Sequence, residues 1–168
     1  MTIGPDSILI KNIKEKFGQS ILDTSIFRDE ATHLIRKESL LEVCKFLKDN
    51  SELQFNFLSD IAGIDYFPQN PRFEVVYHLY SISQKHRVRL KIKTEDGETV
   101  PSVTPVWSGA DWAEREAYDM FGIIFEGHPN LKRIYMPDEW EGFPLRKDYP
   151  LKGYKDRYNP YGEEKDKR

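Results

Sequence analysis

Four charged side chains at close spacing are the first candidates for chemistry in this sequence. Glu114, Arg115 and Glu116 are consecutive, and Asp119 follows within the same predicted helix, residues 109–121. On a helix, Arg115 and Asp119 are close enough to pair, and Glu116 and Asp119 lie side by side. Two neighbouring carboxylates are either an acid–base pair with a raised pKa or the salt-bridge partners of arginines on another chain. Charged helix faces are common, so the pattern favours the second interpretation.

A second set of residues lies in the C-terminal third of the chain, where charged side chains are mixed with prolines and aromatic rings. It consists of Gly127, His128, Pro129, Lys132, Arg133, Arg146, Lys147, Asp148 and Tyr149. Basic residues interleaved with aromatic ones are typical of single-stranded nucleic-acid binding. However, the acidic residues Asp138, Glu139 and Glu141 interrupt the set, and the net charge of the chain is −3. A continuous phosphate-binding surface is therefore not predicted.

An independent enzyme is the alternative, with Glu116, Asp119 and His128 as acid–base groups. The sequence contains no glycine-rich phosphate loop, no Gly-x-Ser-x-Gly motif and no His-Glu-x-x-His motif. Its one cysteine, Cys44, lies on an apolar helical stripe and cannot by itself hold an iron–sulfur cluster, a four-ligand zinc ion or an internal disulfide. We therefore expect Cys44 to be a core residue, and we expect this chain to carry no flavin, cluster or metal.

Apolar periodicity predicts the elements that position these residues. Helical spacing predicts helices over residues 7–17, 37–50 and 109–121. Alternating apolar residues predict strands over residues 21–28, 31–36, 53–66, 72–82 and 86–94. Helices and strands do not alternate strictly, which favours an α+β fold over a doubly wound sheet. We expect two layers, a mixed sheet covered by helices.

The helix that carries the four charged residues has recognisable ends. Ser108 is placed as its N-cap, and Asp111, three residues further on, is placed to complete a capping box. Trp107 and Trp112 are spaced for a hydrophobic staple across this end. Gly122 is placed to end the helix.

The C-terminal third differs in composition from the rest of the chain. Half of the ten prolines lie between Pro129 and Pro160, together with several tyrosines, and regular periodicity stops after Gly127. Aromatic side chains bury large areas at a small entropic cost, so this mixture predicts an extended arm that packs on a partner. We expect a domain over residues 1–127, a partner-wrapping arm over residues 128–162 and a charged, frayed tail over residues 163–168. Neither a signal peptide nor a membrane span is predicted, which favours a soluble, cytoplasmic chain.

Several of these motifs resemble one known family. The run from Trp112 to Gly122 contains Glu-Arg-Glu-x-x-Asp and is followed by Gly-His-Pro, a Lys-Arg pair and Pro-Leu-Arg-Lys-Asp-Tyr at residues 144–149. Together they resemble the 30 kDa subunit family, also called the C subunit, of the NADH–quinone oxidoreductase (respiratory complex I). The resemblance covers residues 53–153. One departure is Phe143, where the family often has a histidine, so that a titratable group is lost.

The resemblance implies a stand-alone, non-catalytic subunit of a proton-translocating complex that works as an enzyme only when assembled. The chain would lie on the cytoplasmic side of the membrane without entering it, and its arm would dock on the D subunit of the complex, near the quinone-reduction module. Flavin, iron–sulfur clusters and quinone would belong to partner subunits. A corresponding subunit of a ferredoxin- or hydrogenase-linked relative is the alternative, since such complexes also contain members of the family.

Overall fold

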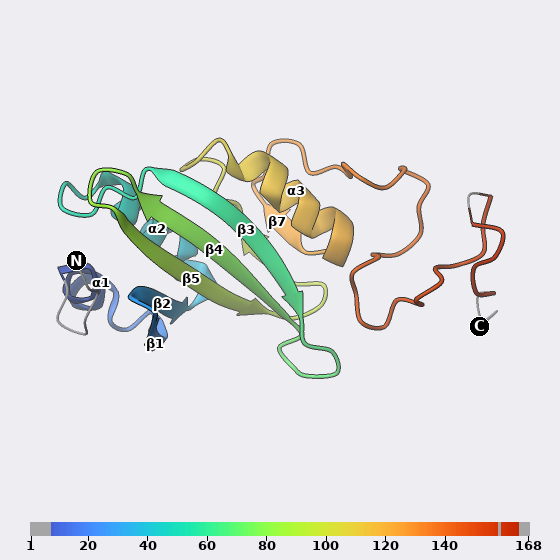
Figure 1. Ribbon diagram of the computed structural model, residues 1–168, viewed down its shortest axis with the longest axis horizontal. Coiled ribbons are helices and arrows are strands. Elements are labelled where there is room, and N and C mark those ends of the chain that lie inside the picture. Colours follow the sequence, from blue (N-terminus) through green and yellow to red (C-terminus); the bar gives the residue numbers. More distant parts are fainter. Residues whose placement is uncertain (1–7, 158, 165–168) are drawn as a thin grey trace.

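The computed structural model describes residues 8–157 and 159–164 and shows an α+β fold built on a five-stranded mixed sheet (Figure 1). The strands lie in the order β1-β2-β5-β4-β3. Only β2 and β5 are parallel, and the other neighbours are antiparallel. The five strands are β1 Ile21–Phe27, β2 Glu30–Ile35, β3 Phe57–Asp65, β4 Phe73–Ser81 and β5 His86–Thr94. The fold class expected from the sequence is confirmed.

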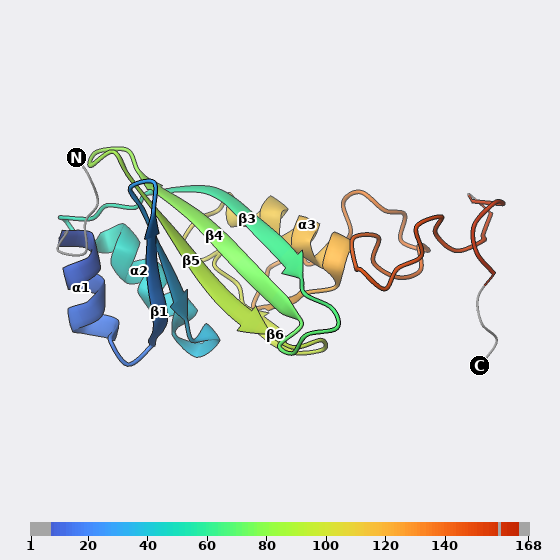
Figure 2. The ribbon, with the colours of Figure 1, turned by 60° about the horizontal axis from the view of Figure 1, so that its bottom comes forward.

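One face of this sheet holds the core, and the opposite face carries the charged side chains. On β5, Val88, Leu90 and Ile92 are buried, as the alternation predicts, and the intervening arginines and lysines lie on the other face. The helices lie behind the sheet in Figure 2, so that the face with the charged side chains has no helix over it. The two faces therefore differ as the period-two pattern predicts.

Two helices from the first 50 residues pack on the core. They are α1 Ile8–Phe17 and α2 Leu40–Asp49, the latter preceded by a 3₁₀ turn, η1 Lys37–Ser39. The apolar stripe of α2, including Cys44, is fully buried. Burial raises the pKa of the Cys44 thiol well above its ordinary value, so that Cys44 is a core residue and not a reactive thiolate.

The third helix, α3 Ala110–Phe121, lies along β3 and carries the charged signature. A small parallel ladder of β6 Thr99–Pro101 and β7 Ile124–Glu126 joins the segments on either side of it. Neither short strand was predicted, because three residues are too few for a periodic pattern. The strand expected over residues 53–66 begins only at Phe57, since Leu53 and Phe55 are buried in a loop before it.

The predicted start of α3 is wrong in its details, whereas the predicted end is right. The N-cap is Gly109, and it makes no side-chain capping bond. Trp107 and Trp112 form no staple, because Trp107 is buried with its indole N–H donating to the carbonyl oxygen of Phe55, while Trp112 is 64% exposed. The helix does end at Gly122, which has a φ of 78°.

Beyond Glu126, the described part of the chain contains no further helix or named strand, in keeping with the loss of periodicity. The chain runs past the end of α3 and away from the sheet (Figure 1). A single bridge between Tyr154 and Glu163 folds the last described residues back on themselves. Among the described residues, no helix is long and apolar enough to cross a membrane.

Gly122 gives a first prediction. A Cβ atom at this position would lie 2.5 Å from the Phe143 ring and 2.7 Å from the Arg146 guanidinium, in addition to the strain of a left-handed backbone. We expect Gly122→Ala to lower the free energy of unfolding by about 2 kcal/mol or more, measured by urea denaturation. Gly97→Ala is the matched control, because its φ is 85° but its Cβ would meet nothing within 4 Å. Equal losses in the two variants would mean that the contact with the arm adds nothing.

Candidate functional site

Asp119 on α3 anchors the first part of the arm. Its Oδ2 atom accepts hydrogen bonds from the backbone N–H groups of Ile134, Tyr135 and Met136 at 2.8–3.0 Å. Its Oδ1 atom accepts a hydrogen bond from Nη1 of Arg133 at 2.7 Å. Burial raises the pKa of this carboxyl group, but the donated hydrogen bonds outweigh burial and hold the pKa below its ordinary value. Asp119 is therefore a charged anchor for the backbone and not an acid–base group.

The two arginines around this anchor also bind the arm. Arg133 donates from Nη2 to the carbonyl oxygens of Trp140 and Gly142 at 3.1 and 3.0 Å. Arg115 donates from Nε and Nη2 to the carbonyl oxygens of Lys132 and Arg133 at 3.1 and 3.3 Å. The expected pairing of Arg115 with Asp119 is therefore wrong. The arginine that pairs with Asp119 belongs to this chain and not to another one.

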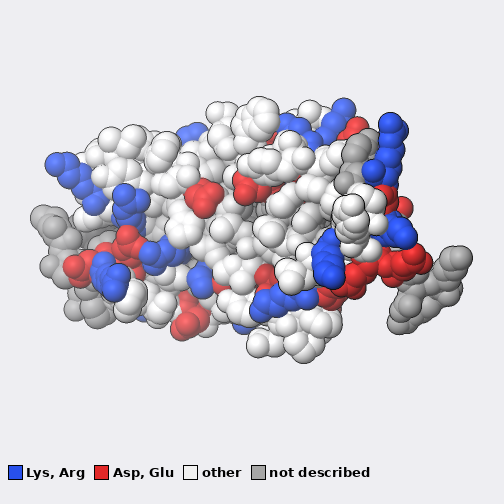
Figure 3. Space-filling model, turned by 45° about the vertical axis from the view of Figure 1, so that its right-hand side comes forward, with Lys and Arg blue, Asp and Glu red and all other residues white. Residues whose placement is uncertain are grey.

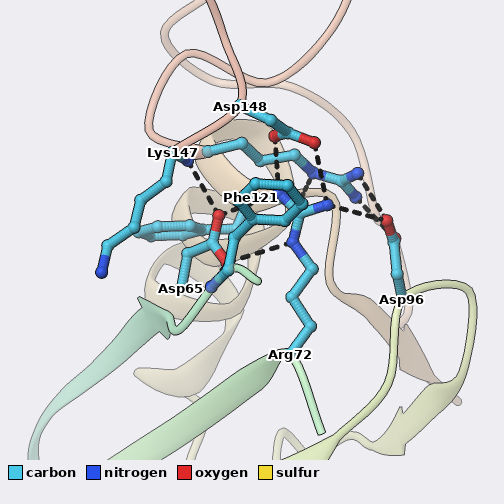
Figure 4. A network of polar contacts seen from close by, with 8 residues as sticks. Asp65, Arg72, Asp96, Phe121, Lys147 and Asp148 are labelled. Atoms are coloured by element: carbon cyan, nitrogen blue, oxygen red, sulfur yellow. Dashed lines mark hydrogen bonds and ion pairs between the residues drawn. The ribbon is translucent and has the colours of Figure 1, made fainter. Parts of the chain in front are cut away.

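Further along the arm, a network of charged groups holds the chain against the end of the sheet (Figure 4). We call it the arm clasp, and it consists of Asp65, Arg72, Asp96, Arg146, Lys147 and Asp148. Asp65 ends β3, Arg72 precedes β4 and Asp96 follows β5. Because β3, β4 and β5 are antiparallel neighbours, these three positions meet at one end of the sheet.

Three contacts close the clasp. Arg72 lies between two carboxylates, with its Nη2 atom 2.9 Å from Asp65 and 2.5 Å from Asp148. Arg146 makes a two-pronged contact with Asp96 at 2.8 Å for each pair of atoms. The backbone N–H of Lys147 donates to Asp65 at 2.8 Å. Since the contacts alternate in sign, the clasp neutralises most of its own charge.

The clasp perturbs the pKa values of its members. Burial of Asp65 raises its pKa, but hydrogen bonds from Arg72 and from the backbone of Lys147 and Phe67 lower it further, to about 2. The hydrogen bond from Arg72 also lowers the pKa of Asp148. The same contacts raise the pKa of Arg72. The charged forms are thus the stable ones at neutral pH.

Phe143 links the Asp119 anchor to the clasp. The guanidinium carbon of Arg133 lies 5.2 Å from its ring centroid, and that of Arg146 lies 4.7 Å from it. Tyr118 makes an edge contact with the same ring at 6.3 Å. An aromatic face next to two cations is attractive, whereas a protonated histidine at this position would be repelled. The departure from the family pattern at Phe143 is therefore compatible with the arginines around it.

Glu114 is fully buried and faces away from the arm. Its carboxylate accepts hydrogen bonds from the Ser102 hydroxyl and from the Val103 N–H, both at 2.7 Å. Burial is the main reason that its pKa is raised to about 7, although the two donors act in the opposite direction. Glu114 thus ties α3 to the segment after β6 and does not contact the exterior.

The other predicted site residues are spread around α3 and the arm. Glu116 is exposed and accepts a hydrogen bond from the Tyr135 hydroxyl at 3.4 Å. The His128 ring accepts the Asn130 N–H at Nδ1, which leaves Nε2 to donate to the Asp111 carbonyl oxygen at 3.2 Å. Gly127, Pro129 and the Lys132 side chain are exposed, and Tyr149 packs edge-on against Tyr154. Glu116, Asp119 and His128 thus have separate partners and do not form one acid–base site.

The sequence reasoning missed Asp65, Arg72 and Asp96. Each lies at or next to the end of a predicted strand, and the order of those strands in an antiparallel sheet would have placed them at the same edge. Their charges alone do not reveal this, because the pairing order of the strands is set by the tertiary fold. Among the described residues, no group of three or more His, Cys, Asp or Glu side chains is placed to hold a metal ion.

Comparison with known proteins identifies the class to which this fold and this site belong. Residues 33–155 match the family model described as "Respiratory-chain NADH dehydrogenase, 30 Kd subunit". The chain therefore belongs to this family, and the resemblance seen in its motifs is confirmed.

Individual relatives agree with this assignment. The chain is 58% identical over 148 residues to one of the NADH-quinone oxidoreductase C subunits, number 2, of Rhizobium meliloti, with 88% of this chain and 81% of the relative covered. It is 52% identical over 142 residues to the NADH-quinone oxidoreductase C subunit of Geotalea uraniireducens, covering 84% and 85% of the two chains.

A solved structure shares the fold. A chain of the membrane-bound sulfane sulfur reductase, described as an archaeal respiratory membrane complex, superimposes with a TM-score of 0.73. The match covers 85% of this chain and 84% of the other, at 23% sequence identity.

The arm clasp predicts how stability responds to acid. The folded-state pKa of Asp65 is below its unfolded value, so its contribution is present at neutral pH and is lost as pH falls from about 4 to about 2. We expect Asp65→Asn to lower the free energy of unfolding by about 2 kcal/mol at pH 7 and to reduce the acid dependence. Urea denaturation at pH 7, 4 and 2 measures both effects. Asp23→Asn, an exposed carboxylate on β1, is the control, and equal losses in the two variants would contradict the role of the clasp.

Glu114 predicts a dependence of the opposite sign. Its folded-state pKa is above its unfolded value, so its contribution to stability is full below about pH 4.5 and is lost as pH rises to about 7. Glu114→Gln keeps the shape and an acceptor for the Val103 N–H but removes the charge. We expect the variant to gain up to about 3 kcal/mol relative to the parent between pH 5 and pH 8, measured by urea denaturation. A parallel pH dependence in both proteins would show that Glu114 stays ionised throughout.

Proposed function

We propose that this chain is a non-catalytic subunit of a proton-translocating NADH–quinone oxidoreductase. It docks on the D subunit near the quinone-reduction module and supports assembly of the electron-transfer arm, on the cytoplasmic side of the membrane. The names of its relatives support membership of such a complex. The division of the arm into a fixed part and an exposed part supports the docking role.

The fixed part, which we call the arm root, comprises residues 128–149. Asp119 and the arm clasp hold it, and a backbone hydrogen bond from Leu145 to the Met120 carbonyl oxygen at 3.1 Å adds a further contact. The expectation that residues 128–162 as a whole pack on a partner is therefore wrong for the root. This part belongs physically to the domain.

The exposed part, the distal arm, comprises residues 150–164 as far as the structure describes them. Leu151 is fully exposed, and Tyr161 is 89% exposed. Leu151 also lies at the edge of a hollow of about 640 Å³, lined by Trp140, Pro144 and Tyr149 among others. Apolar and aromatic side chains presented on a fixed base are typical of interface anchors, and this is the observation that carries the proposal.

The distribution of charge favours a protein partner over a nucleic acid. Acidic and basic side chains lie next to each other toward the end of the molecule that carries the arm (Figure 3). The basic residues at the arm root are engaged as well, since Arg133 and Arg146 contact carboxylates of the domain. A surface of mixed sign does not attract a polyanion over a long distance.

Redox cofactors are proposed to belong to the partner subunits. The one thiol, Cys44, is buried in the core, and the carboxylates of Glu114 and Asp119 are used in internal contacts. An independent acid–base enzyme has less support, because Asp119 and His128 are already bonded to the domain and the arm root. Flavin, iron–sulfur clusters and quinone accordingly bind elsewhere in the assembly.

Two truncations test this proposal. A chain ending at Tyr149 keeps the arm root, so we expect it to retain its thermal stability but to lose most of the D subunit that co-purifies with the parent. A chain ending at Gly127 also loses Arg133 and the three N–H groups that satisfy Asp119. We expect it to be destabilised by about 3 kcal/mol or more, because a buried carboxylate is left unpaired. The measurements are thermal melting of the free chain and quantitative mass spectrometry of the tagged complex.

Point variants of the distal arm provide the matched control. We expect the Leu151→Ser, Tyr161→Ser double variant to weaken the association by about tenfold or more. Lys152→Ser removes an exposed, charged side chain between the same two positions and should leave the association unchanged. Full association after removal of residues 150–168 would contradict the docking role.

A further inference from the structure

A groove that shares no lining residue with the arm clasp has features that neither the clasp nor the distal arm explains. It lies between β3, α3 and the arm root and has a volume of about 240 Å³. Its lining includes Leu58, Asp60, Trp112, Glu116, Ile134 and Tyr135. Small-molecule sites are larger, roughly 300–1,000 Å³, whereas this volume corresponds to about eight water molecules. The groove therefore has the size of one long side chain.

Two aromatic rings at this groove are exposed to an unusual degree. Trp112 is 64% exposed and Tyr135 is 63% exposed. Leaving such rings in water forgoes a large gain from burial, and exposed Trp and Tyr side chains mark interaction surfaces more often than other residue types do. Trp112 also contacts the Arg115 guanidinium at 5.0 Å, so one arginine already stacks on its ring. Its remaining surface is free for another group.

The charge of the groove selects the occupant. Asp60 and Glu116 supply two carboxylates, and none of the described residues that line the groove is basic. Neither carboxylate has an ion-pair partner among the described residues, in contrast to Asp65, Asp119 and Asp148. The charge of Glu116 also raises the pKa of the Tyr135 hydroxyl, as expected where negative potential is not compensated.

We infer that this groove receives an arginine side chain from a neighbouring subunit. A guanidinium is planar, binds carboxylates through paired N–H groups and stacks on aromatic faces, which matches each element of the lining. Arginine, tryptophan and tyrosine are also the residues that dominate interface energies and tend to pair with one another. The inference rests on the proposed function, because it takes the arginine from a partner in the same assembly. It adds a second contact, formed by β3 and α3, to that of the distal arm.

The test uses the assembled complex, purified through a tag on this chain. We compare the Trp112→Ala, Glu116→Gln double variant with Phe27→Ala, Glu15→Gln, which removes an exposed ring and an exposed carboxylate from other surfaces. We expect the groove variant to retain about tenfold less of its partner subunits after a high-salt wash, with unchanged thermal melting of the free chain. The control variant should retain them as the parent does.

A photo-crosslinking residue in place of Trp112 identifies the occupant. We expect a cross-linked peptide from another subunit that contains an arginine at or next to the linked position. Cross-links only within this chain, cross-links to an apolar segment without arginine, or equal retention by the two double variants would each overturn the inference. If the proposed function itself were wrong, no partner subunits would co-purify with the parent chain, an outcome distinct from failure of the groove alone.

Discussion

The contact on which the rest of the molecule depends is the one between the buried carboxylate of Asp119 and the arm root. A carboxylate without solvent is stable only when donors replace the lost water. Four donors do so, the guanidinium of Arg133 and three consecutive backbone N–H groups, and all four come from the arm. A helix with a buried acid thus fixes the path of a segment that has no regular structure of its own.

The spacing of the charged residues in α3 follows from this constraint. Successive residues on a helix are about 100° apart, so residues 114 and 119 lie on well-separated faces. Glu114 contacts the segment after β6 inside the domain, whereas Asp119 and Arg115 contact the arm root. Glu116 lies close to the arm but is exposed, with its carboxylate toward the groove. One helix therefore connects the sheet, the arm and an open surface.

The arm clasp extends the same principle to the end of the sheet. Its contacts join residues up to 82 positions apart, and several of the side chains are partly exposed. Single exposed pairs contribute little, but a network around the nearly buried Asp65 and Arg72 holds its charged groups in one geometry. A distal arm that starts from a fixed point loses less conformational entropy when it binds than one that starts from a mobile linker. This is the physical advantage of anchoring the root internally.

The sequence by itself determined the elements whose evidence is local. The buried stripe of α2, the alternation on β4 and β5, the end of α3 at Gly122 and the loss of periodicity in the arm depend on residues a few positions apart, and all were predicted. The family was also recognisable, because its motifs are contiguous runs. The short strands β6 and β7 were not, and the start of α3 differed because Trp107 is bonded in the core rather than to its own helix.

Only the tertiary structure decided the partners of the charged residues. From the sequence, Asp119 and Arg146 fit contacts to another chain equally well, since an ion pair has no preferred sequence separation. Their partners, Arg133 and Asp96, lie 14 and 50 residues away and are brought close by the packing of α3 and by the end of the antiparallel strands. The sequence thus specified which residues are charged and on which elements they lie. Whether a charge faces its own domain or a partner depends on how those elements pack.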